Sequence, residues 1–150
     1  MKLHTITHSK AETVELAKKI GARLIKGDIL TLSGDLGAGK TTFVTGVAKS
    51  LKIKDEVISP TFNILKCYFD GKLPLYHIDA YRLKDANKDI GLEEYIEGNG
   101  IAIVEWPIYI KELLNVPHLA ITIKNKGGNL RELTFKAPNQ YYAKKIRGIL

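Results

Sequence analysis

The chain has 150 residues, of which 45% are apolar and 26% are charged, a composition typical of one globular domain with its own core. Its single cysteine, Cys67, excludes an internal disulfide, fits a reducing compartment and is interpreted as a core residue. The first ten residues lack the apolar core of a signal peptide, and no apolar run reaches the length of a membrane span. We therefore expect a single cytoplasmic domain over residues 1–150, with no membrane as a partner.

The net charge of +7 is concentrated near the C-terminus. Residues 1–110 carry 15 Lys and Arg against 14 Asp and Glu, whereas residues 111–150 carry 8 against 2. The excess ends in Lys144, Lys145 and Arg147. Two interpretations stay open: a surface for an anionic partner such as RNA, or a basic helix face exposed to solvent.

The first predicted helix starts at Ser9, because Ser9 and Glu12 have the S-x-x-E spacing of a capping box. Apolar residues at helical spacing extend this helix to about Gly27. A short buried strand is predicted at residues 29–33, and a second amphipathic helix begins near Gly39.

The stretch between this strand and the second helix fits G-x-x-x-x-G-K-[ST], the pattern of phosphate-binding loops. It reads Gly34, Asp35, Leu36, Gly37, Ala38, Gly39, Lys40, Thr41. Glycine lets successive backbone N–H groups turn toward an anion, and the helix start adds its positive dipole end. We expect these residues and Thr42 to hold nucleotide phosphates, with Lys40 at the β- and γ-phosphates and the Thr41 hydroxyl on Mg²⁺.

Further along the chain, apolar runs predict five more strands, at residues 63–69, 73–78, 101–104, 119–123 and 130–135. The first two flank Asp70-Gly71 and indicate a β-hairpin. The polar stretch 84–100 predicts one or two short helices with loops, and residues 139–150 predict a terminal helix. Interleaved helices and buried strands favour an α/β fold, with a P-loop NTPase-like, mixed and largely parallel β-sheet covered by helices on both faces.

Two acids, Asp79 and Glu105, each follow a buried strand, where the acid of a phosphate site faces the phosphates. Such a site needs an acid for Mg²⁺ and a group that orients water, and spacing alone does not assign which acid contacts the metal. Each acid has the alternative of a strand-end salt bridge or cap. Thr61, fixed by Pro60, is a candidate hydroxyl near the γ-phosphate, with an ordinary turn as its alternative. His77 shares a strand face with Asp79 and is interpreted as an ordinary buried histidine.

The choice of nucleotide and of reaction rests on what the sequence lacks. A guanine-binding loop needs N-K-x-D, and the nearest match, which begins at Asn125, has no aspartate; this favours ATP over GTP. His4 and His8 have no metal-ligating neighbours in sequence, so no zinc site is expected. A small-molecule kinase needs an arginine-rich lid, yet Arg82 is the only arginine between the loop and Glu105, which favours an ATPase. A non-enzymatic tRNA-binding module that uses the basic C-terminal helix is the other alternative.

Five motifs together resemble the TsaE (YjeE) family, the small P-loop ATPases of tRNA threonylcarbamoyladenosine biosynthesis. Their order and spacing agree over nearly the whole chain. They are GDLGAGKTTF at 34–43, SPTF at 59–62, YHIDAYRL at 76–83, GLEEY at 91–95 and VEWP at 104–107. The resemblance implies a single α/β domain that binds and hydrolyses ATP with Mg²⁺.

The resemblance also implies roles for particular residues. Thr41 and Glu105 would bind the Mg²⁺, and Asp79 would be needed for hydrolysis. Thr61 would belong to a switch-like segment, and Arg131 would occupy the position of a nucleotide-contacting arginine.

Partners follow from the same resemblance. Family members act with TsaD, which carries out the carbamoyl transfer to tRNA, and with TsaB. The ATPase would be weak alone and stimulated by these partners, serving as a nucleotide switch on a TsaB–TsaD complex, with tRNA reached through the complex. Ser9, together with Lys10, would border the adenine.

Overall fold

The structure is a computed structural model that describes residues 1–60 and 62–149. Thr61, predicted to be catalytic, and Leu150 lie outside the described residues. The described strands are β1 (Lys2–Thr7), β2 (Ile29–Ser33), β3 (Leu65–Tyr68), β4 (Leu75–Asp79), β5 (Ile101–Glu105), β6 (Leu119–Asn125) and β7 (Arg131–Lys136). The described helices are α1 (Lys10–Gly21), α2 (Lys40–Ser50), α3 (Glu93–Ile96) and α4 (Gln140–Ile146), with 3₁₀ segments η1 (Tyr81–Leu83) and η2 (Pro107–Leu113).

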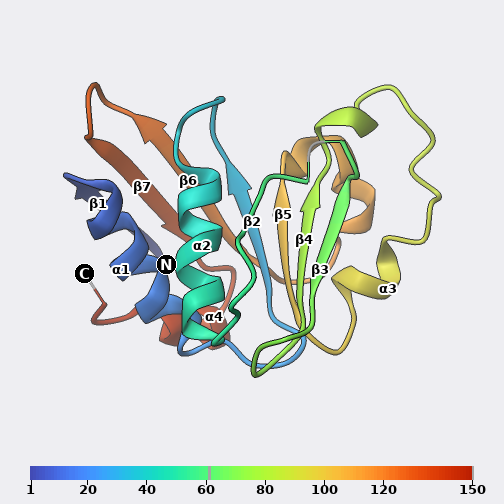
Figure 1. Cartoon of the computed structure of the whole chain (residues 1–150), viewed down its shortest axis with the longest axis horizontal. Coiled ribbons are helices and arrows are strands. Elements are labelled where there is room, and N and C mark those ends of the chain that lie inside the picture. Colours follow the sequence, from blue (N-terminus) through green and yellow to red (C-terminus); the bar gives the residue numbers. More distant parts are fainter. Residues whose placement is uncertain (61, 150) are drawn as a thin grey trace.

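The strands form one sheet in the order β1-β7-β6-β2-β5-β4-β3 (Figure 1). The four central strands, β6, β2, β5 and β4, run parallel to one another. Both edges are antiparallel, with β3 paired to β4 on one side and β7 and β1 beyond β6 on the other. The predicted hairpin and the predicted mixed sheet are therefore confirmed. The parallel centre brings the carboxyl ends of β2, β5 and β4 to the same edge of the sheet.

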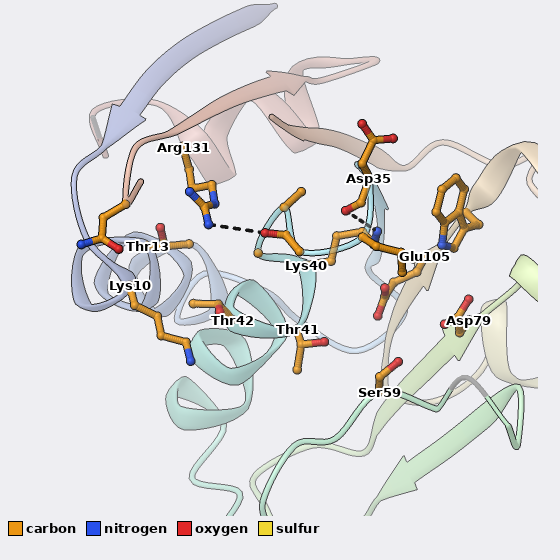
Figure 2. A pocket seen from close by; sticks show the side chains of 16 residues that line it. Lys10, Thr13, Asp35, Lys40, Thr41, Thr42, Ser59, Asp79, Glu105 and Arg131 are labelled. Carbon is orange, nitrogen blue, oxygen red and sulfur yellow. Dashed lines mark hydrogen bonds between the residues drawn. The ribbon is translucent and has the colours of Figure 1, made fainter. Parts of the chain in front are cut away.

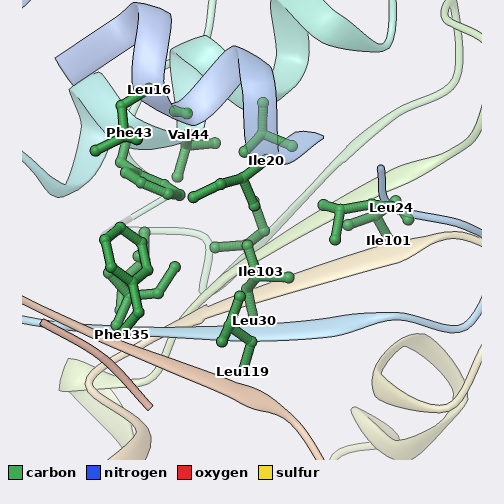
Figure 3. Packing of buried hydrophobic residues seen from close by; sticks show 14 of the residues in the cluster. Leu16, Ile20, Leu24, Leu30, Phe43, Val44, Ile101, Ile103, Leu119 and Phe135 are labelled. Atoms are coloured by element: carbon green, nitrogen blue, oxygen red, sulfur yellow. The ribbon is translucent and has the colours of Figure 1, made fainter. Parts of the chain in front are cut away.

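Helices cover both faces of this sheet, as predicted. Figure 3 shows Leu16 and Ile20 of α1 and Phe43 of α2 above the buried side chains of the sheet. A second cluster on the opposite face joins β4 and β5 to α3, η1 and η2; it includes Ile78, Val104 and Ile96. Because both faces are covered, β5 is buried at every position and is apolar up to its last residue.

Close contact between α1 and α2 depends on a glycine. A Cβ atom at Gly46 would lie 2.5 Å from the Cβ of Ala17 and 2.5 Å from the carbonyl oxygen of Val14. No side chain fits at that distance, so a glycine at this position lets the two helices pack backbone against side chain. Their packing fixes the direction in which α2 leaves the phosphate-binding loop.

Several predicted elements differ from the structure in extent, and one strand was not predicted. The helix α1 begins after Ser9 as predicted, but it ends at Gly21 rather than near Gly27, because the chain turns there while Leu24 still reaches the core. The edge strand β1 was not predicted, since only alternate residues of its mostly polar sequence face the protein. The stretch 84–100 contains a single helical turn, α3, and the terminal helix α4 ends at Ile146.

No helix in the described part of the chain is both long enough and apolar enough to cross a membrane.

Candidate functional site

A cavity of about 540 Å³ lies at the carboxyl ends of the parallel strands. Its walls come from α1, the loop between β2 and α2, the ends of β4 and β5, and the β6–β7 hairpin (Figure 2). The lining residues are Lys10, Thr13, Asp35, Leu36, Gly37, Ala38, Gly39, Lys40, Thr41, Thr42, Ser59, Asp79, Glu105, Trp106, Asn129 and Arg131. The predicted loop, both predicted strand-end acids and Arg131 thus meet around one space.

The loop presents the start of α2 to the cavity. Its last residue, Gly39, has φ of 110°, a left-handed conformation that favours glycine, and no side chain caps the helix there. The first N–H groups of a helix have no partner within the helix, and here they face the cavity beside Thr41 and Thr42. Helix starts of this kind bind anions such as phosphates.

Lys40 is held over the loop. Its ammonium donates hydrogen bonds to the carbonyl oxygens of Gly34 and of Asp35, the latter at 3.3 Å. The same nitrogen lies 4.7 Å from the centroid of the Trp106 ring. Trp106 itself has a left-handed backbone, with φ of 56° and ψ of 52°, at the turn from β5 into η2. Gly34 does not line the cavity, but its carbonyl oxygen fixes the lysine that does.

The two predicted acids lie opposite each other at the ends of adjacent parallel strands. Both Asp79 and Glu105 are buried, and both reach the cavity. One oxygen of Asp79 accepts a hydrogen bond from the N–H of Tyr81 at 3.0 Å. In the view of Figure 2 the carboxylate of Glu105 lies between Thr41 and Asp79, and Ser59 lies below them.

The guanidinium of Arg131 connects the β6–β7 hairpin to the loop. One of its terminal nitrogens donates to Asn125 Oδ1 at 3.1 Å and to the carbonyl oxygens of Gly128 and Leu130, and the other reaches the carbonyl oxygen of Gly37 at 3.4 Å (Figure 2). Nothing in the sequence pattern singles out this arginine, because its approach to the loop depends on how the hairpin folds over it.

Of the two N-terminal residues predicted to border the adenine, Lys10 lines the cavity and Ser9 does not. The hydroxyl of Ser9 accepts a hydrogen bond from the N–H of Glu12 at 3.1 Å and caps α1. Thr13, which was not predicted, lines the cavity one helical turn beyond Lys10 on the same face. Helical spacing from Lys10 was the signal that would have pointed to Thr13.

His77, expected to be an ordinary histidine, contacts one of the two predicted acids. Its Nε2 lies 2.5 Å from Oε2 of Glu105, and both side chains are buried. The strand-face alternation that placed His77 beside Asp79 was the available signal, but a contact with Glu105 crosses from β4 to β5 and depends on the register of the sheet.

The donors in the cavity fit Mg²⁺. This ion prefers oxygen ligands and is held in nucleotide sites by one or two carboxylates together with a hydroxyl and the phosphates. The Thr41 hydroxyl and the carboxylates of Glu105 and Asp79 are donors of that kind. Among residues 1–60 and 62–149, no group of three or more His, Cys, Asp or Glu side chains is arranged to hold a metal ion.

A phosphate-binding loop between β2 and α2 of a mixed, largely parallel sheet, with acids at the ends of the neighbouring strands, defines a P-loop NTPase-like fold. Comparison with known proteins makes this specific. The family model described as "Threonylcarbamoyl adenosine biosynthesis protein TsaE" matches residues 7–133. The chain therefore belongs to the TsaE family, and the resemblance seen in its motifs is confirmed.

Individual relatives agree with this assignment. The tRNA threonylcarbamoyladenosine biosynthesis protein TsaE of Bacillus subtilis is 50% identical over 136 residues, covering 91% of this chain and 86% of the relative. The protein of the same name from Rickettsia prowazekii is 40% identical over 132 residues, covering 86% and 90%. The crystal structure of Bacillus subtilis YdiB superposes with a TM-score of 0.86 at 42% identity, covering 99% of this chain and 94% of that one.

Proposed function

We propose that this chain binds ATP with Mg²⁺ in the cavity and hydrolyses it, as the nucleotide-dependent component of tRNA threonylcarbamoyladenosine biosynthesis. One observation supports the proposal above all: the uncapped start of α2, the ammonium of Lys40 and two buried carboxylates line the same cavity. Anion-binding N–H groups on one side and acids on the other are what a phosphate chain with a divalent cation requires.

The residues of the cavity divide into those that hold phosphate and those that act on the metal and on water. The loop N–H groups hold the phosphates, and Lys40 exchanges its contacts with the loop carbonyl oxygens for contacts with the β- and γ-phosphates. Thr41 and Glu105 hold the Mg²⁺, which when bound offsets the charge that develops on the transferred phosphoryl group. Asp79 orients the attacking water, and Thr61 adds a hydroxyl near the γ-phosphate.

The remaining cavity residues complete the nucleotide site. Arg131 carries positive charge beside the loop and contacts the nucleotide from the hairpin side. Lys10, the first residue of α1, borders the base, and Ser9 precedes it in the chain as the helix cap.

Partner proteins dock near the mouth of the cavity in this proposal. Leu36, at the loop, is 90% exposed, and Phe62, in the segment that also carries Ser59, is 85% exposed. In this proposal the two exposed side chains are contact points for a partner protein. Membership of the TsaE family supports TsaB and TsaD as the partners, with the ATPase acting as a switch on their complex.

The test is an ATPase assay in three steps: the chain alone, then with the TsaB–TsaD complex, then with tRNA added. We expect slow hydrolysis alone and faster hydrolysis with the partners, and Lys40→Ala should abolish both. Equilibrium binding of ATP with and without Mg²⁺ accompanies the assay. A purified, folded chain that binds no ATP with Mg²⁺ would overturn the proposal, and phosphate appearing on a metabolite without partners would favour a kinase.

The terminal helix gives limited support to a non-enzymatic RNA-binding module. Lys145 is buried, and its ammonium lies 3.2 Å from Oδ2 of Asp28. Arg23 donates to the carbonyl oxygens of Lys144 and Arg147, which fixes this end of the chain against the turn that follows α1. Neutralising Lys145 would therefore test folding as much as RNA binding.

A further inference from the structure

His77 differs from the other buried side chains of β4 because it is fully buried and only one of its two ring nitrogens has a hydrogen-bond partner among the described residues. The side chain is 0% exposed. Its Nε2 lies 2.5 Å from Oε2 of Glu105, while its Nδ1 has no hydrogen-bond partner among the described residues. Buried polar atoms are nearly always paired. The single hydrogen-bonding contact of this buried ring, to Glu105, therefore needs an explanation.

The sheet register explains how His77 reaches Glu105. In the parallel pair of β4 and β5, Asp79 lies opposite Glu105, and His77 lies opposite Ile103. Alternation puts all four side chains on the face that α1 and α2 cover, which is also the face of the loop. The imidazole therefore extends along the sheet toward the carboxylate of the next pair, beneath the cavity floor.

The surroundings determine where the ring proton lies. An ionised carboxylate only accepts hydrogen bonds, so the nitrogen that faces it carries the hydrogen. The geometry therefore assigns a hydrogen to Nε2, which is donated to Oε2 of Glu105.

We propose that His77 is a positioning residue for the metal ligand: its Nε2–H holds one oxygen of Glu105, and the other oxygen is thereby aimed at Mg²⁺. This inference rests on the proposed function of Glu105. A glutamate has several side-chain torsions to fix, and Mg²⁺ demands near-ideal octahedral geometry. Hydrogen bonds from a surrounding residue to a metal-ligating carboxylate orient it and strengthen metal binding.

The first test needs neither metal nor nucleotide. A long-range ¹H–¹⁵N correlation spectrum of the metal-free protein near pH 7.5 reports which imidazole nitrogens carry hydrogen, and the His77→Gln variant identifies the His77 signals among the four histidines. We expect a hydrogen on Nε2. A ring that carries a hydrogen on Nδ1 and none on Nε2 would overturn the proposal.

The second test uses a matched pair of variants. The amide nitrogen of His77→Gln falls where Nε2 was, whereas that of His77→Asn falls where Nδ1 was and cannot reach Glu105. We expect the Mg²⁺ concentration for half-maximal ATP binding to rise about 10- to 100-fold in His77→Asn and to stay near wild type in His77→Gln. Both variants should bind ATP alike in EDTA, and thermal unfolding establishes that each is folded.

The variant Glu105→Gln separates failure of the inference from failure of the proposed function. If Glu105→Gln leaves the Mg²⁺ dependence unchanged, the metal role of Glu105 is wrong, and the positioning role of His77 fails with it. If Glu105→Gln shifts that dependence and His77→Asn does not, the inference fails while the proposed function stands. An equal shift in His77→Gln and His77→Asn would also overturn it. In the double variant, His77→Asn should add no further shift to Glu105→Gln.

Discussion

Buried carboxylates lie at both ends of the parallel sheet, and the two ends differ in the groups that contact them. At the amino end of β2, Asp28 accepts from the ammonium of Lys145, from the hydroxyl of Tyr141 and from the N–H of Ile25. At the carboxyl end, the carboxylate of Glu105 contacts a histidine, and among the described residues no Lys or Arg lies within 4.0 Å of it. Buried charges are costly unless paired, so the amino end stabilises the fold, whereas the carboxyl end keeps donors and acceptors for a ligand.

The two long helices show the same division. The start of α1 is closed by its own residues: Ser9 accepts from the N–H of Glu12, and Glu12 accepts from the N–H of His8 at 2.7 Å. The start of α2 follows Gly39 and has no side-chain cap. An uncapped helix start costs stability, which a bound anion restores. In the proposed function, this uncapped start is where the nucleotide phosphates bind.

The largest effect should come from the cation at the carboxyl end. Lys40→Ala removes the cation that is held directly over the loop, and we expect ATP hydrolysis with partners to fall by a factor of about 100 or more. The unfolding midpoint should change little, because the ammonium contacts two loop carbonyl oxygens and the Trp106 ring at the wall of a cavity rather than in the core. The matched control is Lys49→Ala, an exposed lysine in the last turn of the same helix. Full activity in Lys40→Ala would contradict the view that the carboxyl end of the sheet serves the reaction while the amino end serves stability.

At the amino end the loss should be in stability alone. Asp28→Ala leaves Lys145 buried without its partner, which costs about 3–5 kcal/mol in comparable buried pairs. Urea unfolding measures the change, and ATP binding by the fraction that remains folded should match wild type. Glu15→Ala is the control, because its ion pair with Lys18 is exposed and should contribute less than about 1 kcal/mol. Loss of ATP binding in folded Asp28→Ala would show that the two ends are coupled.

The two acids of the carboxyl end should differ from each other. Glu105→Gln should raise the Mg²⁺ concentration needed for ATP binding about 10- to 100-fold, because it weakens a metal ligand. Asp79→Asn should lower the turnover number while ATP and Mg²⁺ bind as in wild type, because it removes a group that orients water. Thr41→Ala should behave like Glu105→Gln. The same Mg²⁺ response in Glu105→Gln and Asp79→Asn would contradict the assignment of their roles.

The fold was largely predictable because its strong signals are local. The glycine-rich loop between a strand and a helix, the buried strands and the Ser9 capping box each depend on residues close in sequence, and the structure has all of them at or near their predicted bounds. The edge strand β1 escaped prediction because an edge needs few apolar residues. The predicted helix before β2 ran past Gly21 because Leu24 continues the apolar spacing from within a turn.

The site was predictable only in part, because its remaining contacts join distant segments. The loop and the strand-end acids carry their own sequence signals. The contact between His77 and Glu105 depends on the register of β4 and β5, and the approach of Arg131 to Gly37 depends on how the last hairpin folds. The burial of Lys145 could not be predicted either. The basic residues next to it in sequence suggested an exposed face, but Lys145 forms an ion pair with the buried Asp28.

The smallest effect should appear at high pH, at the amino end. Burial of its hydroxyl, then its hydrogen bond to Asp28, raises the pKa of Tyr141 above the ordinary tyrosine value, although the residue as a whole is 44% exposed. A raised pKa means that the folded protein keeps this proton while the unfolded chain loses it. The stabilising contribution is therefore complete below about pH 10 and declines as the pH rises above that value.

Replacing the hydroxyl isolates this contribution. In Tyr141→Phe the free energy of unfolding should fall less steeply between about pH 9 and pH 11 than in wild type, as measured by urea unfolding at each pH. Lysine deprotonation over the same range affects both proteins, so the difference in slope belongs to Tyr141. Identical slopes would mean that folding does not raise the pKa of Tyr141. The buried carboxylate of Asp28 would then be stabilised mainly by Lys145.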